Sequence, residues 1–240
     1  MTDLLYHSDS YLKEFEAIVI KNDRESNAVI LDRTAFYPGG GGQVPDTGSI
    51  RSGEITYNLV RAKHSPEGIL HFLEPGIPLP PEGAHIIGVL DWERRYQVMR
   101  THTAMHILCG VIFRDFGAHV TGGDMEPLKG RMDFEFESMS GELVGVINSA
   151  INKEVQASRD VRVKILPRDE AFKIPDLIRT KINLLPEGIA EVRSVEIIGL
   201  DLQADGGTHV KNTSEVGVMH VTDYKSKGKI NKRIYIELDQ

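Results

Sequence analysis

The sequence Arg100-Thr-His-Thr-Ala-Met-His-Ile-Leu-Cys-Gly110 lies in a segment whose apolar residues recur at helical spacing. It places His102 and His106 four residues apart, so both imidazoles lie on one helix face, with Cβ atoms about 5–6 Å apart. That spacing suits two ligands of one metal ion. A second pair with the same separation, Asp205 and His209, flanks a Gly-Gly-Thr sequence, whose glycines allow both side chains to turn towards one point.

The two pairs together form a chemically sensible ligand set for zinc. Three imidazoles and one carboxylate offer nitrogen and oxygen donors at about 2.0–2.2 Å from such an ion. We therefore predict one zinc ion per chain, held by His102, His106, Asp205 and His209. The chain does not match a His-Glu-x-x-His metalloprotease, because Thr103 occupies the place of the glutamate that acts as general base.

Cys109 lies on the same helix face, three residues after His106. A sulfur ligand from the helix and a buried thiol of the core are both open interpretations, and we favour the buried thiol because free cysteine behaves as a small apolar residue.

The composition is typical of a globular protein with a sizeable core. Of 240 residues, 40% are hydrophobic and 26% are charged, and no apolar run is long enough to span a membrane. The lone cysteine excludes an internal disulfide framework, and together with the lack of a visible secretory signal it favours a cytoplasmic location. The net charge of −7 argues against coating nucleic acid by bulk charge, and we expect neither a membrane nor DNA as a partner.

One local exception to this acidic balance lies near the C-terminus. Residues 224–235 contain no acid and five cations, namely Lys225, Lys227, Lys229, Lys232 and Arg233. Two interpretations are open with equal weight, a solvated hairpin turn and a strip that faces RNA.

The first third of the chain consists of short strand-like segments and turns. Alternating and β-branched residues predict strands at residues 15–21, 27–31, 54–61 and 68–73. The proline- and glycine-rich sequence at residues 75–83 then breaks any regular structure. We therefore predict a β-rich domain over residues 1–83 and a metal domain over residues 84–240.

A glycine-rich sequence, Phe36-Tyr-Pro-Gly-Gly-Gly-Gly-Gln43, lies between these strands and predicts a loop, because glycine is unfavourable inside helices and strands. It is not a P-loop, since no Gly-Lys-Ser/Thr follows, and Val44 breaks the spacing of a dinucleotide fingerprint. Taken alone, the loop is best interpreted as a wide β-turn.

The rest of the chain mixes helices and strands without regular βαβ repeats, so the fold class is predicted to be α+β. A helix over residues 92–116, capped by Asp91, and a second helix over residues 140–158 are expected. Strands are expected at residues 85–90, 131–136, 161–166 and 190–198, with a loop at 117–124, a helical turn at 168–173 and a terminal hairpin of residues 216–223 with 230–238.

Three motifs in this order, at residues 36–48, 100–106 and 206–209, make the chain resemble the editing domain of alanyl-tRNA synthetase. The closest resemblance is to its free-standing relatives, the AlaX family, of the medium-sized type, and it covers essentially the whole chain. The resemblance implies a small β-barrel-like domain followed by an α/β-sandwich metal domain of the threonyl/alanyl-tRNA synthetase editing type. It also implies a zinc-dependent trans-editing deacylase that hydrolyses Ser-tRNA(Ala), so that mischarged alanine tRNA is the expected partner. Whether Gly-tRNA(Ala) is also a substrate is left open by the sequence.

The resemblance also assigns residues. It places the four zinc ligands at the positions named above and places Gly40, Gly41, Gly42 and Gln43 near the bound aminoacyl group, with Gln43 as the candidate catalytic residue. A pocket that must hydrogen-bond the serine hydroxyl would leave a polar group unpaired with alanine, and the candidates for that contact are Thr34, Thr121 and Thr208.

Position 205 departs from the synthetase pattern, where it is cysteine. Our hypothesis is that Asp205 leaves the zinc more electrophilic and removes an oxidisable ligand. Two other functions stay open: a non-catalytic tRNA-binding module with a structural zinc, because four protein ligands close a site, and a zinc hydrolase of a small-molecule ester. The sequence does not indicate an oligomeric state.

Overall fold

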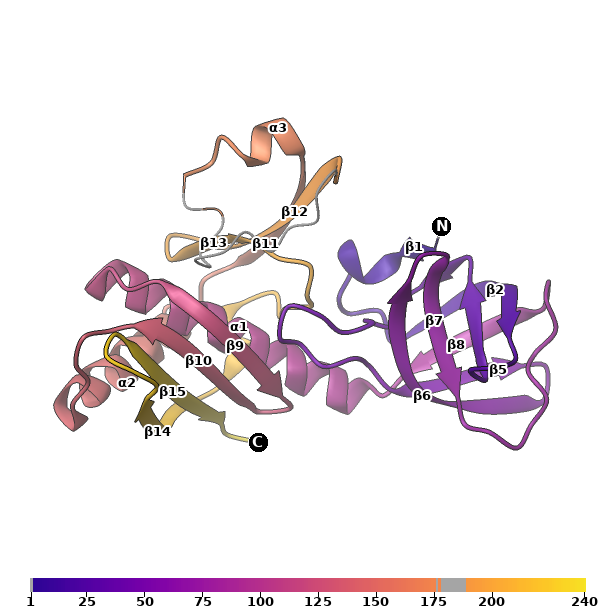
Figure 1. Ribbon diagram of the computed structural model, residues 1–240, viewed down its shortest axis with the longest axis horizontal. Coiled ribbons are helices and arrows are strands. Elements are labelled where there is room, and N and C mark those ends of the chain that lie inside the picture. The colour runs from indigo at the N-terminus through magenta and orange to yellow at the C-terminus, as the bar shows by residue number, and fades with distance from the viewer. Residues whose placement is uncertain (1, 176, 178–188) are drawn as a thin grey trace. The chain divides into compact units, whose positions relative to one another are not determined.

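The computed structural model describes residues 2–175, 177 and 189–240, and the chain divides into two compact units, Met1–Tyr96 and Gln97–Gln240 (Figure 1). The division falls within helix α1 (Trp92–Phe116), which begins in the first unit and ends in the second. Strand β8 (His85–Leu90) pairs with two strands of the first unit. The boundary therefore lies later than the expected residue 83.

The first unit is a closed barrel, which agrees with the expected β-rich domain. Around the barrel the strand order is β2 (Glu14–Asp23), β3 (Ala28–Leu31), β7 (Gly68–Leu73), β6 (Ile55–Ser65), β5 (Gly48–Ser52) and β8. Apolar side chains such as Val19, Leu31 and Ile50 alternate inward to form its core. Strand β5 was not predicted, because Gly-Ser-Ile-Arg-Ser contains only one β-branched residue.

Two short strands outside the barrel flank its first two strands, because β1 (Asp3–Leu4) precedes β2 and β4 (Arg33–Thr34) follows β3. Strand β1 pairs in parallel with β4, and the 3-10 helix η1 (Leu5–His7) follows β1.

The glycine-rich loop lies between β4 and β5 and is closed by its own backbone. The N–H of Gly40 donates to the carbonyl of Gln43 at 3.1 Å, and the N–H of Gln43 donates back to Gly40 at 2.9 Å. From Gly39 to Gly42 the φ angles lie between 57° and 132°, a region that residues with a side chain rarely adopt. The four glycines are therefore required by the conformation of the loop.

A buried ion pair fastens this loop to the start of α1. Arg95 is fully buried, and its guanidinium pairs with Asp46, with Nε donating to both carboxylate oxygens at 3.0 Å. The Asp46 carboxylate also accepts the N–H of Tyr37 at 2.6 Å, and Arg95 Nη2 donates to the Ala35 carbonyl at 2.6 Å. One guanidinium thus ties together both ends of the loop.

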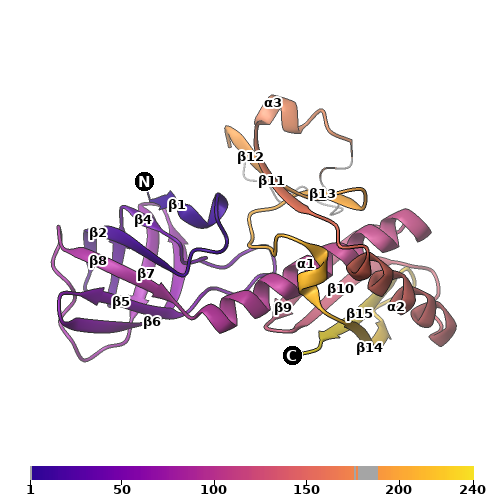
Figure 2. The same ribbon diagram turned by 180° about the vertical axis from the view of Figure 1, so that it is seen from behind.

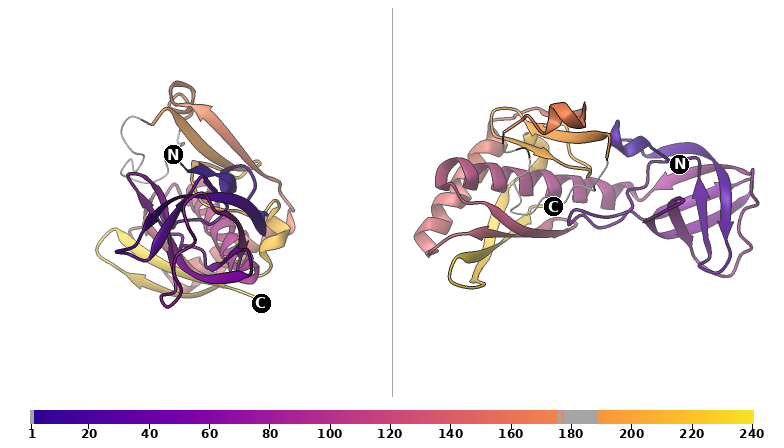
Figure 3. Two further views of the ribbon diagram at one scale, coloured as in Figure 1. Left: turned by 90° about the vertical axis from the view of Figure 1, so that its right-hand side faces the viewer. Right: turned by 45° about the horizontal axis from the view of Figure 1, so that its top comes forward.

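The second unit places α1 between two sheets (Figures 1 and 3). One sheet has the order β14 (Met219–Ser226), β15 (Asn231–Leu238), β10 (Lys129–Glu135) and β9 (Val120–Glu126); the other has β11 (Val161–Pro167), β12 (Glu191–Ile197) and β13 (Asp201–Ala204). The remaining elements are α2 (Gly141–Gln156), the short α3 (Arg168–Ala171) and the 3-10 helix η2 (Thr213–Val216).

Helices and antiparallel sheets interleave as an α+β fold, as the sequence predicts (Figure 2). Both long predicted helices are present, and Asp91 accepts the N–H of Arg94 at 3.2 Å at the start of α1. The other predicted strands are present with ends that shift by a few residues. None of the described helices is long and apolar enough to cross a membrane.

The expected loop at residues 117–124 is wrong from Val120 onward, because strand β9 begins there. Its glycines suggested a turn, but Gly123 packs against α1. A Cβ on Gly123 would lie 3.1 Å from Met105 Cε, and one on Gly130 of β10 would lie 2.8 Å from Met105 Sδ. Glycine in these strands therefore allows the helix to approach the sheet closely.

Candidate metal centre

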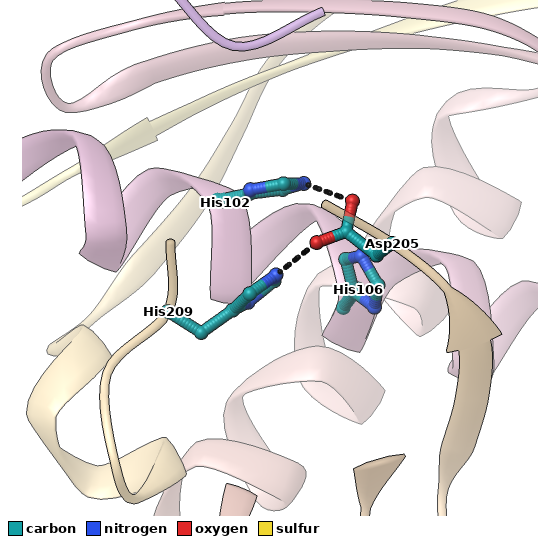
Figure 4. A group of neighbouring side chains, drawn as sticks. All are labelled: His102, His106, Asp205 and His209. Atoms are coloured by element: carbon teal, nitrogen blue, oxygen red, sulfur yellow. Dashed lines mark hydrogen bonds and ion pairs between the residues drawn. The ribbon is translucent and has the colours of Figure 1, made fainter. Parts of the chain in front are cut away.

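The four residues expected to bind metal converge on one point in the second unit (Figure 4). His102 and His106 come from consecutive turns of α1, whereas Asp205 and His209 come from the segment that follows β13. Figure 4 shows the Asp205 carboxylate with one oxygen directed at His102 and the other at His209. These contacts measure 3.5 Å to His102 Nε2 and 3.0 Å to His209 Nε2.

The imidazoles are oriented by contacts on their other ring nitrogens. His106 Nδ1 lies 3.0 Å from a carboxylate oxygen of Asp201, and His209 Nδ1 lies 3.1 Å from the hydroxyl of Thr103. Such partners fix the tautomer of a metal-binding histidine and leave Nε2 as the ligand atom. The Thr103 hydroxyl also accepts the N–H of Val210 at 3.2 Å, which holds the chain beside His209 against α1.

The close approach of the β12–β13 turn to α1 depends on Gly110, which lies one turn after His106 on the helix. A Cβ at Gly110 would lie 2.8 Å from Leu200 Cγ and 3.0 Å from Asp201 Cβ. A larger residue would push this turn away from the helix, and with it the carboxylate that contacts His106. Gly110 thus connects the packing of the turn to the orientation of an imidazole.

Backbone and guanidinium contacts hold Asp205 in place. Its N–H donates to the Arg193 carbonyl at 3.0 Å, its carbonyl accepts Arg193 Nη1 at 2.9 Å, and its Oδ2 accepts the N–H of Gly207 at 2.8 Å. Arg193 Nη1 also lies 3.7 Å from Asp205 Oδ2. Asp205 is therefore positioned by Arg193 of β12 and by the backbone of its own turn.

Burial and charge set the protonation states of the cluster. Burial lowers the pKa of His102 well below its ordinary value and lowers the pKa of His209 to about 4. Burial would raise the pKa of Asp205, but the charge on His102 and the hydrogen bond from His209 outweigh it and hold that pKa well below the usual range. Neutral imidazoles beside a carboxylate are the states that a metal ion requires.

His106 differs from the other two imidazoles. Burial would lower the pKa of His106, but the hydrogen bond and charge of Asp201, together with the charge of Asp205, outweigh burial and raise it. The raised pKa reflects the carboxylates on both sides of this ring, which in a metal site serve to increase the basicity of the ligand.

The donor set fits a zinc ion. The four ligand atoms lie within 4.8 Å of one another, and the three histidines are buried. An ion at about 2.0–2.2 Å from four tetrahedral ligands requires ligand atoms about 3.3–3.6 Å apart. The contacts of 3.5 and 3.0 Å from Asp205 to His102 and His209 are close to that spacing.

Known proteins resemble this chain over almost its full length. It is 42% identical over 238 residues, with 98% of each chain covered, to "Alanyl-tRNA editing protein AlaX-M" of Saccharolobus solfataricus. This chain belongs to the AlaX-M family. The relative of the same name from Methanosarcina acetivorans is 37% identical, with 99% of each chain covered.

This chain also resembles parts of larger enzymes. It is 40% identical over 226 residues to "Alanine--tRNA ligase" of Ignicoccus hospitalis, matching 92% of this chain and 24% of the ligase. Family models match at residues 192–235, the second additional domain of threonyl and alanyl tRNA synthetases, and at residues 9–94, class II (A) tRNA synthetases. The family resemblance expected from the sequence is confirmed.

The threonines expected to read the substrate lie in three different settings in this AlaX-M chain. Thr208 is fully buried within the turn that carries Asp205 and His209. The Thr121 hydroxyl, on β9, is 3.1 Å from the side-chain oxygen of Asn231. Thr34 is fully buried in the barrel unit, where its hydroxyl lies 2.8 Å from His71 Nε2. Their roles stay predictions.

The glycine loop with Gly40, Gly41, Gly42 and Gln43 belongs to the barrel unit. Gln43 is buried within it, and the carbonyl of Gly40 accepts the Tyr37 hydroxyl at 3.0 Å. The catalytic assignment of Gln43 stays a prediction. Cys109 is buried, and it is not among the residues of the described chain that converge on the cluster.

Sequence reasoning missed the residues that orient the ligands. Thr103 was used only to exclude a protease, although its position next to His102 on α1 places it beside the cluster. Nothing in the sequence singles out Asp201 or Arg193, because their partners are distant in the chain. The burial of Arg95 was weakly indicated by the sequence, since this residue lies three residues before Val98 on the buried stripe of α1.

Proposed function

We propose that this chain is a zinc-dependent trans-editing deacylase that hydrolyses the ester of Ser-tRNA(Ala), with Gly-tRNA(Ala) as a second substrate. The observation that carries the proposal is the buried convergence of His102, His106, Asp205 and His209 in a chain of the AlaX-M family. An ester is an activated acyl bond, so hydrolysis does not require a covalent nucleophile from the protein. The proposed partner is mischarged alanine tRNA.

The four convergent residues would hold the zinc ion, while Asp201 and Thr103 orient His106 and His209 through their Nδ1 atoms. A bound zinc ion supplies a Lewis acid, which polarises a carbonyl and lowers the pKa of bound water to about 7. In the proposal, Gln43 acts at the aminoacyl ester, as the family resemblance implies.

Among the candidate threonines, Thr208 is favoured for recognising the serine hydroxyl. It lies within the turn that carries Asp205 and His209, whereas Thr34 belongs to the barrel unit and Thr121 lies on β9. A buried hydroxyl left unpaired by alanine costs about 1–3 kcal/mol, which corresponds to discrimination of about 5- to 150-fold.

The test follows the loss of radiolabelled ester from Ser-tRNA(Ala), Gly-tRNA(Ala) and Ala-tRNA(Ala) with zinc-loaded protein. We expect hydrolysis of the serine ester and, more slowly, of the glycine ester, with the alanine ester spared. His209→Ala should lose zinc and activity together, whereas Asp205→Cys should retain zinc because a thiolate replaces the carboxylate. Gln43→Ala should retain zinc and lose activity.

Controls make this experiment decisive. His220→Ala removes an exposed histidine paired with Asp239 at 2.8 Å, outside the cluster, and should leave zinc content and activity unchanged. Equal zinc content and equal rates for Asp205→Cys and the natural chain would contradict the hypothesis that aspartate makes the ion more electrophilic.

A second function, a non-catalytic tRNA-binding module with structural zinc, is favoured by one observation. Four protein side chains converge, and a closed set of four ligands is typical of structural zinc. Binding of tRNA without zinc-dependent deacylation would support the module and contradict the enzyme. A zinc hydrolase of small-molecule esters would instead show no salt-sensitive binding of tRNA.

A further inference from the structure

The turn that joins β14 to β15 is exposed and strongly basic, in a chain whose net charge is −7. We define the hairpin tip as residues 224–233, which contain five cations and no acid. Residues 224–230 are all exposed, and Tyr224 and Ile230 expose 38% and 50% of their surface. Positive charge is therefore concentrated at one end of this hairpin.

Two of the five cations are neutralised by neighbouring carboxylates. Lys225 lies 3.1 Å from Asp223, and Arg233 forms a two-pronged pair with Asp133 at 2.7 and 2.8 Å. Within the described part of the chain, neither Lys227 nor Lys229 forms an ion pair. The carboxylate that senses the charge of Lys227 is that of Asp133, which is already paired with Arg233.

The third cation, Lys232, holds the backbone of the tip. It is almost fully buried, and its Nζ donates to the carbonyls of Gly228 and Lys229 at 3.0 Å each. The N–H of Lys227 donates to the Asn231 carbonyl at 2.8 Å. The backbone that presents Lys227 and Lys229 is thus ordered in advance, which lowers the entropy lost when a ligand binds.

We propose that the hairpin tip binds the sugar–phosphate backbone of tRNA, with Lys227 and Lys229 as the phosphate contacts. This inference rests on the proposed function, because it names the surface through which the same substrate is held. The ammonium groups of Lys227 and Lys229, which form no ion pair, can neutralise phosphates, and the nucleic acid then releases its condensed counterions. Tyr224 adds an exposed aromatic face beside them, which can stack on an unpaired base.

The chemistry of the tip specifies the kind of recognition. Lysine acts as a point charge and contacts phosphate without reading a base sequence. The tip therefore contributes affinity that is salt-dependent and equal for different tRNAs, and discrimination between substrates belongs to the rest of the protein.

The test measures binding of uncharged, fluorescently labelled alanine tRNA to the full-length, zinc-loaded protein by anisotropy between 50 and 200 mM KCl. In the double variant Lys227→Ala/Lys229→Ala we expect Kd to rise roughly tenfold or more at low salt. The slope of log Kd against log salt should fall by about two, one for each phosphate contact. Lys227→Arg/Lys229→Arg keeps the charges and should keep both values.

Lys129→Ala is the matched control, because Lys129 is exposed on the same sheet but paired with Glu237 at 3.1 Å. It should leave both Kd and the slope unchanged. Zinc content and thermal unfolding establish that each variant is folded, which is expected because the tip is held by Lys232 and backbone groups.

An unchanged Kd and slope in the double alanine variant would overturn the inference, as would an equal effect of Lys129→Ala. The experiments distinguish a failure of this inference from a failure of the proposed function. Salt-sensitive binding through the tip without deacylation would contradict only the enzyme, and deacylation with tip-independent binding would contradict only the tip.

Discussion

Both units of this protein bury histidines, but the partners of the imidazole nitrogens differ between the two units. In the barrel, His71 is fully buried with Nε2 2.8 Å from the Thr34 hydroxyl and Nδ1 3.3 Å from the Val29 carbonyl. Both ring nitrogens are thus occupied by groups of the barrel itself. In the second unit, His106 and His209 use only Nδ1 in this way, and their other nitrogens converge with Asp205.

The difference lies in what occupies the second ring nitrogen, which is a group of the barrel backbone for His71 and a carboxylate shared with a second imidazole for His209. The second nitrogen of His71 is satisfied by a backbone carbonyl, which supports only the barrel. In the second unit, the Nε2 atoms of His106 and His209 face the other candidate metal ligands, an arrangement that a cation stabilises. Barrel residues should therefore affect stability, and cluster residues should affect metal binding.

The largest effect, a loss in the free energy of unfolding, is expected when the buried ion pair of the barrel is broken. Asp46→Ala leaves the fully buried guanidinium of Arg95 without its carboxylate, which costs about 3–5 kcal/mol. The single tryptophan, Trp92, packs 5.8 Å from Tyr96 in the first unit, so its fluorescence during urea unfolding reports this loss.

Glu14→Ala is the matched control, because Glu14 pairs with Arg51 on the surface of the same barrel. Removing an exposed pair should cost less than about 1 kcal/mol. Zinc content should be unchanged in both variants, and loss of zinc from Asp46→Ala would contradict the separation between the two units.

The second-largest effect is a loss of barrel stability in acid, caused by the buried His71. Burial lowers the pKa of His71 from its ordinary 6.5 to about 4. Between those values the unfolded chain binds a proton that the folded barrel does not, so stability falls as pH falls, by about 3 kcal/mol in all. Above pH 6.5 this histidine contributes no pH dependence.

His71→Gln tests this expectation, because glutamine can hydrogen-bond Thr34 but does not titrate. Urea unfolding followed through Trp92 at pH 7, 5.5 and 4 should give a shallower decline for the variant than for the natural chain. Parallel pH profiles for the two proteins would show that His71 is not the buried neutral group described above.

The smallest effect, a fall in zinc affinity, is expected at Asp201. This residue contacts His106 but is not one of the four candidate ligands. Asp201→Asn weakens the contact to His106 Nδ1, so zinc affinity in competition with a chelator should fall about 10- to 100-fold. Asp239→Asn is the control, because it alters a similar contact to exposed His220. Equal zinc affinity in the two variants would show that Asp201 does not position His106.

Much of this protein follows from periodic patterns that its sequence displays directly. Helical spacing predicted α1 with its observed ends, and alternation predicted most of the barrel strands. The pairs His102/His106 and Asp205/His209 were found because each pair is local in the chain. Their meeting was predicted from the chemistry of the set and from a family resemblance.

Strand β9 was not predicted, because Gly123 packs against Met105 of α1 and does not form part of a local turn. The boundary between units was placed too early because β8 closes the barrel only through pairing with β2 and β5. In both cases the deciding contact joins residues that the sequence keeps far apart.

The sequence by itself determined the helix, the residue types of the candidate ligands and the need for a glycine loop, since these depend on spacing and on backbone conformations that few residues adopt. Only the tertiary structure decided which buried polar groups are satisfied within the fold and which converge. It placed Asp201 on His106, Thr103 on His209 and Asp46 on Arg95. Hydrogen bonds between distant segments leave no periodic trace in the chain, because they are selected by packing and not by spacing.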